Sequence, residues 1–194
     1  MLMLVAGMAA AAGVFTFYRT DSVQAQNIQG TDDTLAVAKA ALIGYAVSRG
    51  GPTGNARPGE LPCPDTDAPG TPGYGLENTP CRTAASLIGR LPWRTLGIPE
   101  PKDGAGETLW YALSTTFRDW DSFPLFTSSS ARRINSDSRG NLTVRGPDGS
   151  SVLVSDAVAV VFSPGAPIGA QNRARLNLGN LLGSVTGLLV PGQG

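Results

Sequence analysis

Residues 1–18 read MLMLVAGMAAAAGVFTFY and residues 31–49 read TDDTLAVAKAALIGYAVSR, and these two stretches decide the fold. The first has no charged side chain, and Arg19 is the first charge in the chain. Such a stretch is competent to enter a bilayer, although it is short against the roughly 20 residues of a complete span. We therefore expect residues 1–30 to form a hydrophobic helix with a polar continuation.

Small residues recur along this segment at steps of three and four. They are Ala6, Gly7, Ala10 and Gly13. In lipid, small side chains let two helix backbones approach closely, so this spacing predicts a face that packs against neighbouring helices.

A cleavable signal peptide is the alternative to an anchor, because Val23-Gln24-Ala25 places small residues where a signal peptidase would cut. No Lys or Arg precedes the apolar run, and Arg19 and Asp21 would lie inside the cleavage region. Both features favour an anchor that is retained.

The second stretch predicts an amphipathic helix over residues 31–50. Its apolar residues fall on one face at steps of three and four, namely Leu35, Ala38, Leu42, Tyr45 and Ala46. Thr31 is expected to cap this helix, and Arg49 with the following glycines to end it. Nothing between Arg19 and Gly30 forbids one continuous helix, in which Gly30 is the expected bend.

The composition excludes several function classes. Lys plus Arg number 15, as do Asp plus Glu, and they are scattered, so nucleic acid is not an expected partner. The chain has no histidine, which removes Ser/His/Asp and Cys/His nucleophiles and His-containing zinc sites. It also lacks a P-loop and a Gly-x-Ser-x-Gly elbow. We expect no enzyme and no cofactor, since acidic pairs such as Asp103 with Glu107 arise by chance.

Residues 51–175 are predicted to form a loop-rich globular domain, because the chain holds 25 Gly and 15 Pro. Cys63 and Cys81 lie in turn-rich sequence outside any apolar run, which favours a disulfide over two buried thiols. Closing that loop is expected to stabilise the fold by roughly 3 kcal/mol.

Acidic residues in the same stretch are weak calcium candidates. Asp65, Asp67 and Glu77 offer oxygen ligands at alternating positions, but the glycine and glutamate spacing of an EF-hand is absent. Solvated turn carboxylates are the favoured interpretation, and we expect no metal site.

Four strands are predicted, over residues 108–114, 141–145, 152–155 and 157–162, with Pro147-Asp148-Gly149 as the turn between the second and third. A short helix is expected over residues 83–91, and Trp93 is expected in the core. One small antiparallel sheet packed on the long N-terminal helix, and thus an α+β fold, is the economical arrangement.

Two further segments leave alternatives open. Phe117, Trp120, Phe123 and Phe126 lie in an irregular stretch, where packing onto the sheet is favoured over an aromatic ligand patch. The Gly/Leu-rich tail, residues 176–194, is weak helix at best and could dock on this domain or on a neighbouring subunit.

Several local sequences resemble those of pilin-like proteins of proteobacteria. They are ALIGYA at 41–46, LPCPD at 61–65, GRLPWRTLG at 89–97, LWYA at 109–112 and VVFSPGAP at 160–167. Together with the order hydrophobic helix, amphipathic helix and disulfide-bearing sheet domain, they make residues 35–173 similar to type IV pilins and type II secretion pseudopilins.

The resemblance implies a pilin-like fold and a structural role in a pilus or secretion pseudopilus. Its implied partners are other pilin or pseudopilin subunits and the inner membrane, with the domain in the periplasm or in an extracellular filament. Val5 stands where a major pilin would carry glutamate if Met1 were the mature terminus, so a minor, tip-like subunit is implied. The alternative is a monomeric envelope-anchored module that binds a glycan or peptide through residues 115–126.

Overall fold

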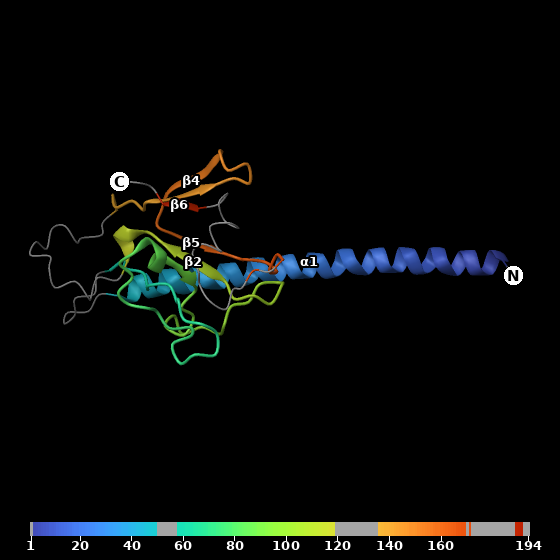
Figure 1. The fold of residues 1–194 in the computed structure, drawn as a ribbon, viewed down its shortest axis with the longest axis horizontal. Coiled ribbons are helices and arrows are strands. Elements are labelled where there is room, and N and C mark those ends of the chain that lie inside the picture. Colours follow the sequence, from blue (N-terminus) through green and yellow to red (C-terminus); the bar gives the residue numbers. More distant parts are fainter. Residues whose placement is uncertain (1, 50–57, 119–135, 170, 172–188, 192–194) are drawn as a thin grey trace, which may run out of the picture.

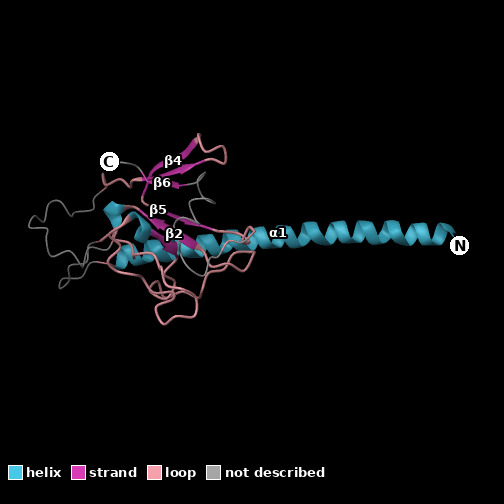
Figure 2. Ribbon diagram, viewed as in Figure 1, coloured by secondary structure: helices cyan, strands magenta, loops and turns pink. Residues whose placement is uncertain are grey.

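The structure is a computed structural model that describes residues 2–49, 58–118, 136–169, 171 and 189–191. For residues 2–23, 85 and 189–191 it describes the backbone alone. The described residues form one long helix and two small antiparallel sheets, which confirms the α+β prediction (Figures 1 and 2).

The helical elements are α1 (Leu2–Ser48) and the short 3-10 turns η1 (Ala84–Leu87) and η2 (Thr115–Phe117). The strands are β1 (Ile88–Arg90), β2 (Trp110–Leu113), β3 (Leu142–Arg145), β4 (Val152–Ala157), β5 (Ala159–Phe162) and β6 (Leu189–Pro191). The four predicted strands are thus present as β2, β3, β4 and β5. The described part of the turn-rich stretch, residues 58–80, holds turns and isolated bridges.

The strands form two sheets instead of the single sheet expected. The first has the order β1-β2-β5, and the second has the order β4-β3-β6. The predicted helix over residues 83–91 is wrong in its second half, because residues 88–90 pair antiparallel with residues 110–112 as β1. Residues 189–191 of the tail are strand instead of the weak helix predicted, and as β6 they dock on this domain by pairing with β3, which is one of the two predicted alternatives. The remainder of the tail, through residue 188, lies outside the described residues.

The core lies between α1 and the first sheet. Tyr111 and Leu113 of β2 point toward α1, and the intervening Ala112 points to the other side, where Leu142 of the second sheet meets it. This alternation is the period of two that a strand buried on both faces requires. The layers are therefore helix, first sheet and second sheet, in the arrangement visible in Figure 1.

α1 buries the face that its sequence predicts. Ala38 and Leu42 are 0% and 5% exposed, and Leu35 and Ala46 pack against the same cluster. The predicted cap at Thr31 is wrong, because the helix runs unbroken through this position and the Thr31 hydroxyl donates to the carbonyl of Asn27, 2.8 Å away. The helix ends at Ser48.

The N-terminal half of α1 projects beyond the domain, and its C-terminal half packs under the sheets (Figure 1). At 1.5 Å per residue, the whole helix is about 70 Å long. Among the side chains that the structure describes, no helix offers a long enough apolar stretch to cross a bilayer. The anchor predicted at residues 1–18 lies outside those side chains.

Candidate functional site

The globular domain contacts α1 from Asn27 onward. The amide of Gly104 donates to the Thr31 hydroxyl at 2.8 Å, and a Cβ at Gly104 would lie 2.6 Å from the carbonyl oxygen of Asn27. Only glycine lets the loop approach the helix this closely. N-terminal to this contact the helix leaves the domain, as Figure 1 shows. The predicted packing residues Ala6, Gly7, Ala10 and Gly13 fall on the projecting backbone, but their side chains lie outside the described residues.

Asp103 stabilises the loop at residues 103–107, which contacts α1 through Gly104. Its Oδ1 accepts hydrogen bonds from the amides of Ala105 and Glu107, both at 2.9 Å. Its Oδ2 accepts from the Ser163 hydroxyl at 2.6 Å and from the amide of Gly165 at 3.0 Å. One carboxylate thus joins the loop that contacts α1 to the segment that follows β5.

The pKa of Asp103 is lowered. Partial burial by itself raises this pKa, but the bonds from Ser163 and from the amides of Glu107, Ala105 and Gly165 outweigh it. Asp103 is therefore an anion near neutral pH, and all four bonds favour that form. Within the chance acidic pair Asp103 and Glu107, the Asp103 carboxylate accepts a hydrogen bond from the backbone amide of Glu107.

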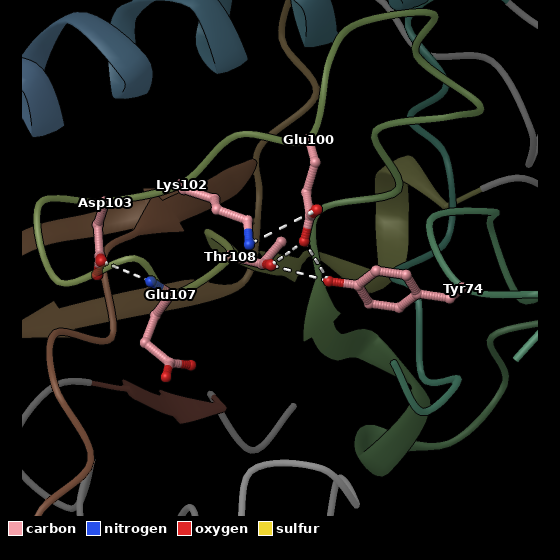
Figure 3. A network of polar contacts seen from close by, with 6 residues as sticks. All are labelled: Tyr74, Glu100, Lys102, Asp103, Glu107 and Thr108. Atoms are coloured by element: carbon pink, nitrogen blue, oxygen red, sulfur yellow. Dashed lines mark hydrogen bonds and ion pairs between the residues drawn. The ribbon is translucent and has the colours of Figure 1, made fainter. Parts of the chain in front are cut away.

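A second polar network lies beside this loop (Figure 3). Oε1 of Glu100 accepts from the hydroxyls of Tyr74 and Thr108, at 2.6 and 2.7 Å, and Lys102 lies 3.8 Å from Oε2. Burial raises the pKa of Glu100, yet the two hydroxyls outweigh it, so the pKa is lowered overall. Burial, followed by the bond to Glu100, raises the pKa of Tyr74. Near neutral pH the carboxylate stays charged and the phenol stays neutral, so the network ties the residue 74 loop to the residue 100–108 loop.

The predicted disulfide between Cys63 and Cys81 is confirmed. Both cysteines belong to the core cluster that packs on α1, at 0% and 1% exposure. The amide of Cys63 donates to Oε2 of Glu77 at 3.2 Å, and the Tyr45 hydroxyl of α1 reaches Oε1 of Glu77 at 3.5 Å. Glu77 therefore links the disulfide loop to the helix.

Tyr111 was not singled out by the sequence, yet it is the largest fully buried side chain of the core. Burial first, and then the neighbouring Tyr45 and Glu77, raise the pKa of Tyr111 well above its ordinary value. Its hydroxyl is buried without a hydrogen-bond partner in the described structure. The strand pattern of residues 108–114 was the only signal that could have placed it inside.

The weak calcium candidates accept hydrogen bonds from other groups of the protein. The carboxylate of Asp65, a fully buried residue, accepts from the amides of Asp67 and Gly75, at 2.8 and 2.7 Å. Burial nevertheless raises the pKa of Asp65. Asp67 accepts a hydrogen bond from the side-chain amide of Asn78 at 3.1 Å. Glu77 accepts hydrogen bonds from the Cys63 amide and the Tyr45 hydroxyl. Across the described residues, no three acidic or cysteine side chains gather in a group that could hold a metal ion.

An apolar groove of about 600 Å³ runs beside α1. Leu35, Ile43 and Val47 of the helix form one wall, and Phe117 and Val161 lie opposite. Phe117 is 7% exposed and belongs to the core cluster, so the packing interpretation holds for this aromatic residue. Trp120, Phe123 and Phe126 lie outside the described residues. Trp93, expected in the core, is only half-buried and lies edge-on to Tyr74, with ring centroids 6.2 Å apart.

Several large apolar side chains of α1 stay uncovered by the domain. Ile28, Val37, Ile43 and Val47 are 61%, 54%, 55% and 79% exposed. Large exposed apolar side chains on a folded domain are candidates for contact with another molecule or with lipid.

Comparisons with known proteins add no assignment to this geometry, because no family model, no curated protein and no solved structure matches the chain.

Proposed function

We propose that this chain is a minor, tip-like structural subunit of a type IV pilus or a type II secretion pseudopilus. The observation that carries the proposal is the division of α1, whose C-terminal half is held by the domain while its N-terminal half projects from it. A single helix that extends far beyond its own domain needs a partner for the projecting part. Like helices of neighbouring subunits, packed within and above the inner membrane, fit that requirement.

Two further observations support the proposal. The domain leaves Ile28, Val37, Ile43 and Val47 exposed on the held half of the helix, so apolar surface remains available for neighbours. The disulfide between Cys63 and Cys81 fits an oxidising compartment such as the periplasm. The resemblance of the local sequences at 41–46, 61–65, 89–97, 109–112 and 160–167 to those of pilin-like proteins supports this class of assembly.

The test uses the small residues of the projecting segment. Replacing Gly7 and Gly13 with leucine raises hydrophobicity, so a passive anchor should keep its hold on the membrane. A packing helix should stay in the membrane but lose crosslinks to co-purifying pilin-like subunits, because bulky groups keep the backbones apart. Ala12→Leu is the matched control, since its spacing places it on the opposite side of the helix from Ala10.

Membrane retention and crosslinking are measured in the same envelope sample. If the Gly7→Leu/Gly13→Leu variant crosslinks as well as the Ala12→Leu variant, the packing role is refuted. If no pilin-like subunit accompanies the unaltered chain at all, the assembly role itself is refuted. Protease added to spheroplasts gives an independent check on location, because a periplasmic domain should be digested and a cytoplasmic one protected.

The second candidate function is a monomeric, envelope-anchored binding module. The groove lined by Leu35, Phe117 and Val161 favours it, and its apolar walls suit a peptide with apolar side chains better than a glycan. Purification of the chain with a bound peptide and without other subunits would favour this candidate over an assembly role.

A further inference from the structure

β4 has an open edge. It pairs with β3 on one side, and among the described residues no strand pairs with its other side. In Figure 1 it lies on the side of the domain farthest from α1. Its residues Val152, Leu153 and Val154 are 54%, 62% and 48% exposed. An exposed strand edge with apolar side chains is a template for a further strand.

β4 lacks several of the features that usually prevent an exposed strand edge from pairing with another strand. β4 contains no Lys, Arg or Pro, and its only charge is Asp156, next to its end. Register shifts in the pairing with β3 indicate bulges, which bend a strand and limit the length of a regular ladder. A strand that docks on this edge therefore makes a short contact.

The sequence of the edge is self-complementary. Residues 151–155 read Ser-Val-Leu-Val-Ser, which is the same in both directions. When two copies run antiparallel and centre on Leu153, Ser151 faces Ser155, Val152 faces Val154, and Leu153 faces its equivalent. Asp156 then faces Ser150, so no like charges are opposed.

We propose that β4 binds β4 of a second copy of this chain, antiparallel, across a two-fold axis at Leu153. Such an axis gives the same patch on both subunits, which is the usual geometry of a homodimer. The patch is small against the about 1,600 Å² of a standard interface, so the contact is weak and forms where copies are concentrated. It uses the opposite side of the domain from α1, so it does not depend on the proposed assembly of the helix.

Engineered cysteines test the axis in the full chain, purified in mild detergent. Both native cysteines are held in their disulfide, so an added cysteine is the only free thiol. Leu153→Cys is expected to form a covalent dimer on mild oxidation. Ser151→Cys is expected to form little dimer by itself, because its two sites lie about 13 Å apart along the paired strands, beyond the about 6 Å between the Cα atoms of a disulfide. A mixture of the Ser151→Cys and Ser155→Cys chains is expected to crosslink.

Ile168→Cys is the matched control, because Ile168 is 73% exposed and lies outside β4. Crosslinking of Leu153→Cys at no more than the Ile168→Cys yield would overturn the proposal. So would a mixture of Ser151→Cys and Ser155→Cys that crosslinks no better than each variant alone.

A second variant tests the apolar contact. Val154→Lys, added to Leu153→Cys, places a charge at the edge in the way that natural strands prevent pairing. We expect it to reduce the dimer yield by about tenfold, equivalent to about 1.4 kcal/mol, while Ile168→Lys in the same background leaves the yield unchanged. Equal yields for the two lysine variants would mean that the crosslink does not report strand pairing.

Discussion

The carboxylate of Asp103 joins the loop that contacts α1 to the segment after β5, so its removal is the sharpest test of how the domain holds α1. Asp103 is 6% exposed and accepts four hydrogen bonds, two within its own loop and two from Ser163 and Gly165. The adjacent Gly104 contacts the helix at Asn27 and Thr31. Asp103→Ala deprives four donors of their acceptor at once, whereas Asp103→Asn retains one acceptor oxygen.

A hydrogen bond to a charged acceptor contributes about 1.5 to 3 kcal/mol. Four such values do not add, because the bonds share one carboxylate and the freed donors partly reach water. We therefore expect Asp103→Ala to lower the free energy of unfolding by about 2 to 3 kcal/mol, and Asp103→Asn by about half as much. Asp33→Ala, at an exposed position of α1, is the control and should change it by less than about 0.5 kcal/mol.

The effect of Asp103 should depend on pH in a defined direction. The folded pKa lies below the unfolded value of about 3.9, so the stabilisation is fully present above that value. It is lost as the pH falls through the folded pKa. The difference between the native chain and Asp103→Ala should thus be constant from about pH 5 to 7 and shrink below about pH 4.

Urea unfolding of the full chain in mild detergent, followed by tryptophan fluorescence at several pH values, measures both effects. A loss below about 0.5 kcal/mol, or a loss that does not change with pH, would refute the role assigned to this carboxylate.

Three other predictions follow from single contacts. Cys63→Ala/Cys81→Ala should lower the free energy of unfolding by about 3 kcal/mol, because the cysteines lie 18 residues apart. In the unreduced, denatured native protein, both cysteines should resist alkylation. Alkylation of both would contradict the disulfide. The Asp148 carboxyl should titrate in an NMR experiment with a pKa of about 2, because it accepts bonds from the Ser151 hydroxyl and amide, and Ser151→Ala should return the midpoint toward 3.8; an unchanged midpoint would exclude this cause. Gly104→Val should accelerate amide hydrogen exchange at residues 27–31 of α1, because its Cβ would displace the loop from the Asn27 carbonyl. Unchanged exchange would mean that contact with this loop does not stabilise the helix there.

The parts of the fold that the sequence predicts are those set by local patterns. The face of α1 that contains Ala38 and Leu42 follows from its helical spacing, and the turn at Pro147-Asp148-Gly149 identifies the β3–β4 hairpin. The disulfide was also predictable, because Cys63 and Cys81 lie in sequence that neither a helix nor a central strand accommodates.

The parts that the sequence misses depend on contacts between distant residues. The helix expected over residues 83–91 is realised as the 3-10 turn η1, which Thr83 caps, while residues 88–90 form a strand. The strand β1 forms because residues 110–112 pair with it, and no local pattern contains that information. The structural role of Asp103 could not be predicted for the same reason, since its partner Ser163 is 60 residues away in the chain. A carboxylate between Lys102 and Gly104 gives no sign in the sequence of the four donors that surround it.

In the C-terminal half of α1, the buried face and the exposed surface beside it relate the fold to the proposed function. One face, with Leu35, Ala38 and Leu42, packs against the core of the domain. The helix surface beside that face carries Ile43 and Val47, which line the same groove as Leu35 and are more than half exposed. A helix that served only its own domain would gain solubility from polar residues at these positions. Exposed apolar residues beside the buried face are instead what a helix requires when it packs on its own domain and on a neighbour along the same length, which is the arrangement that the proposed assembly needs.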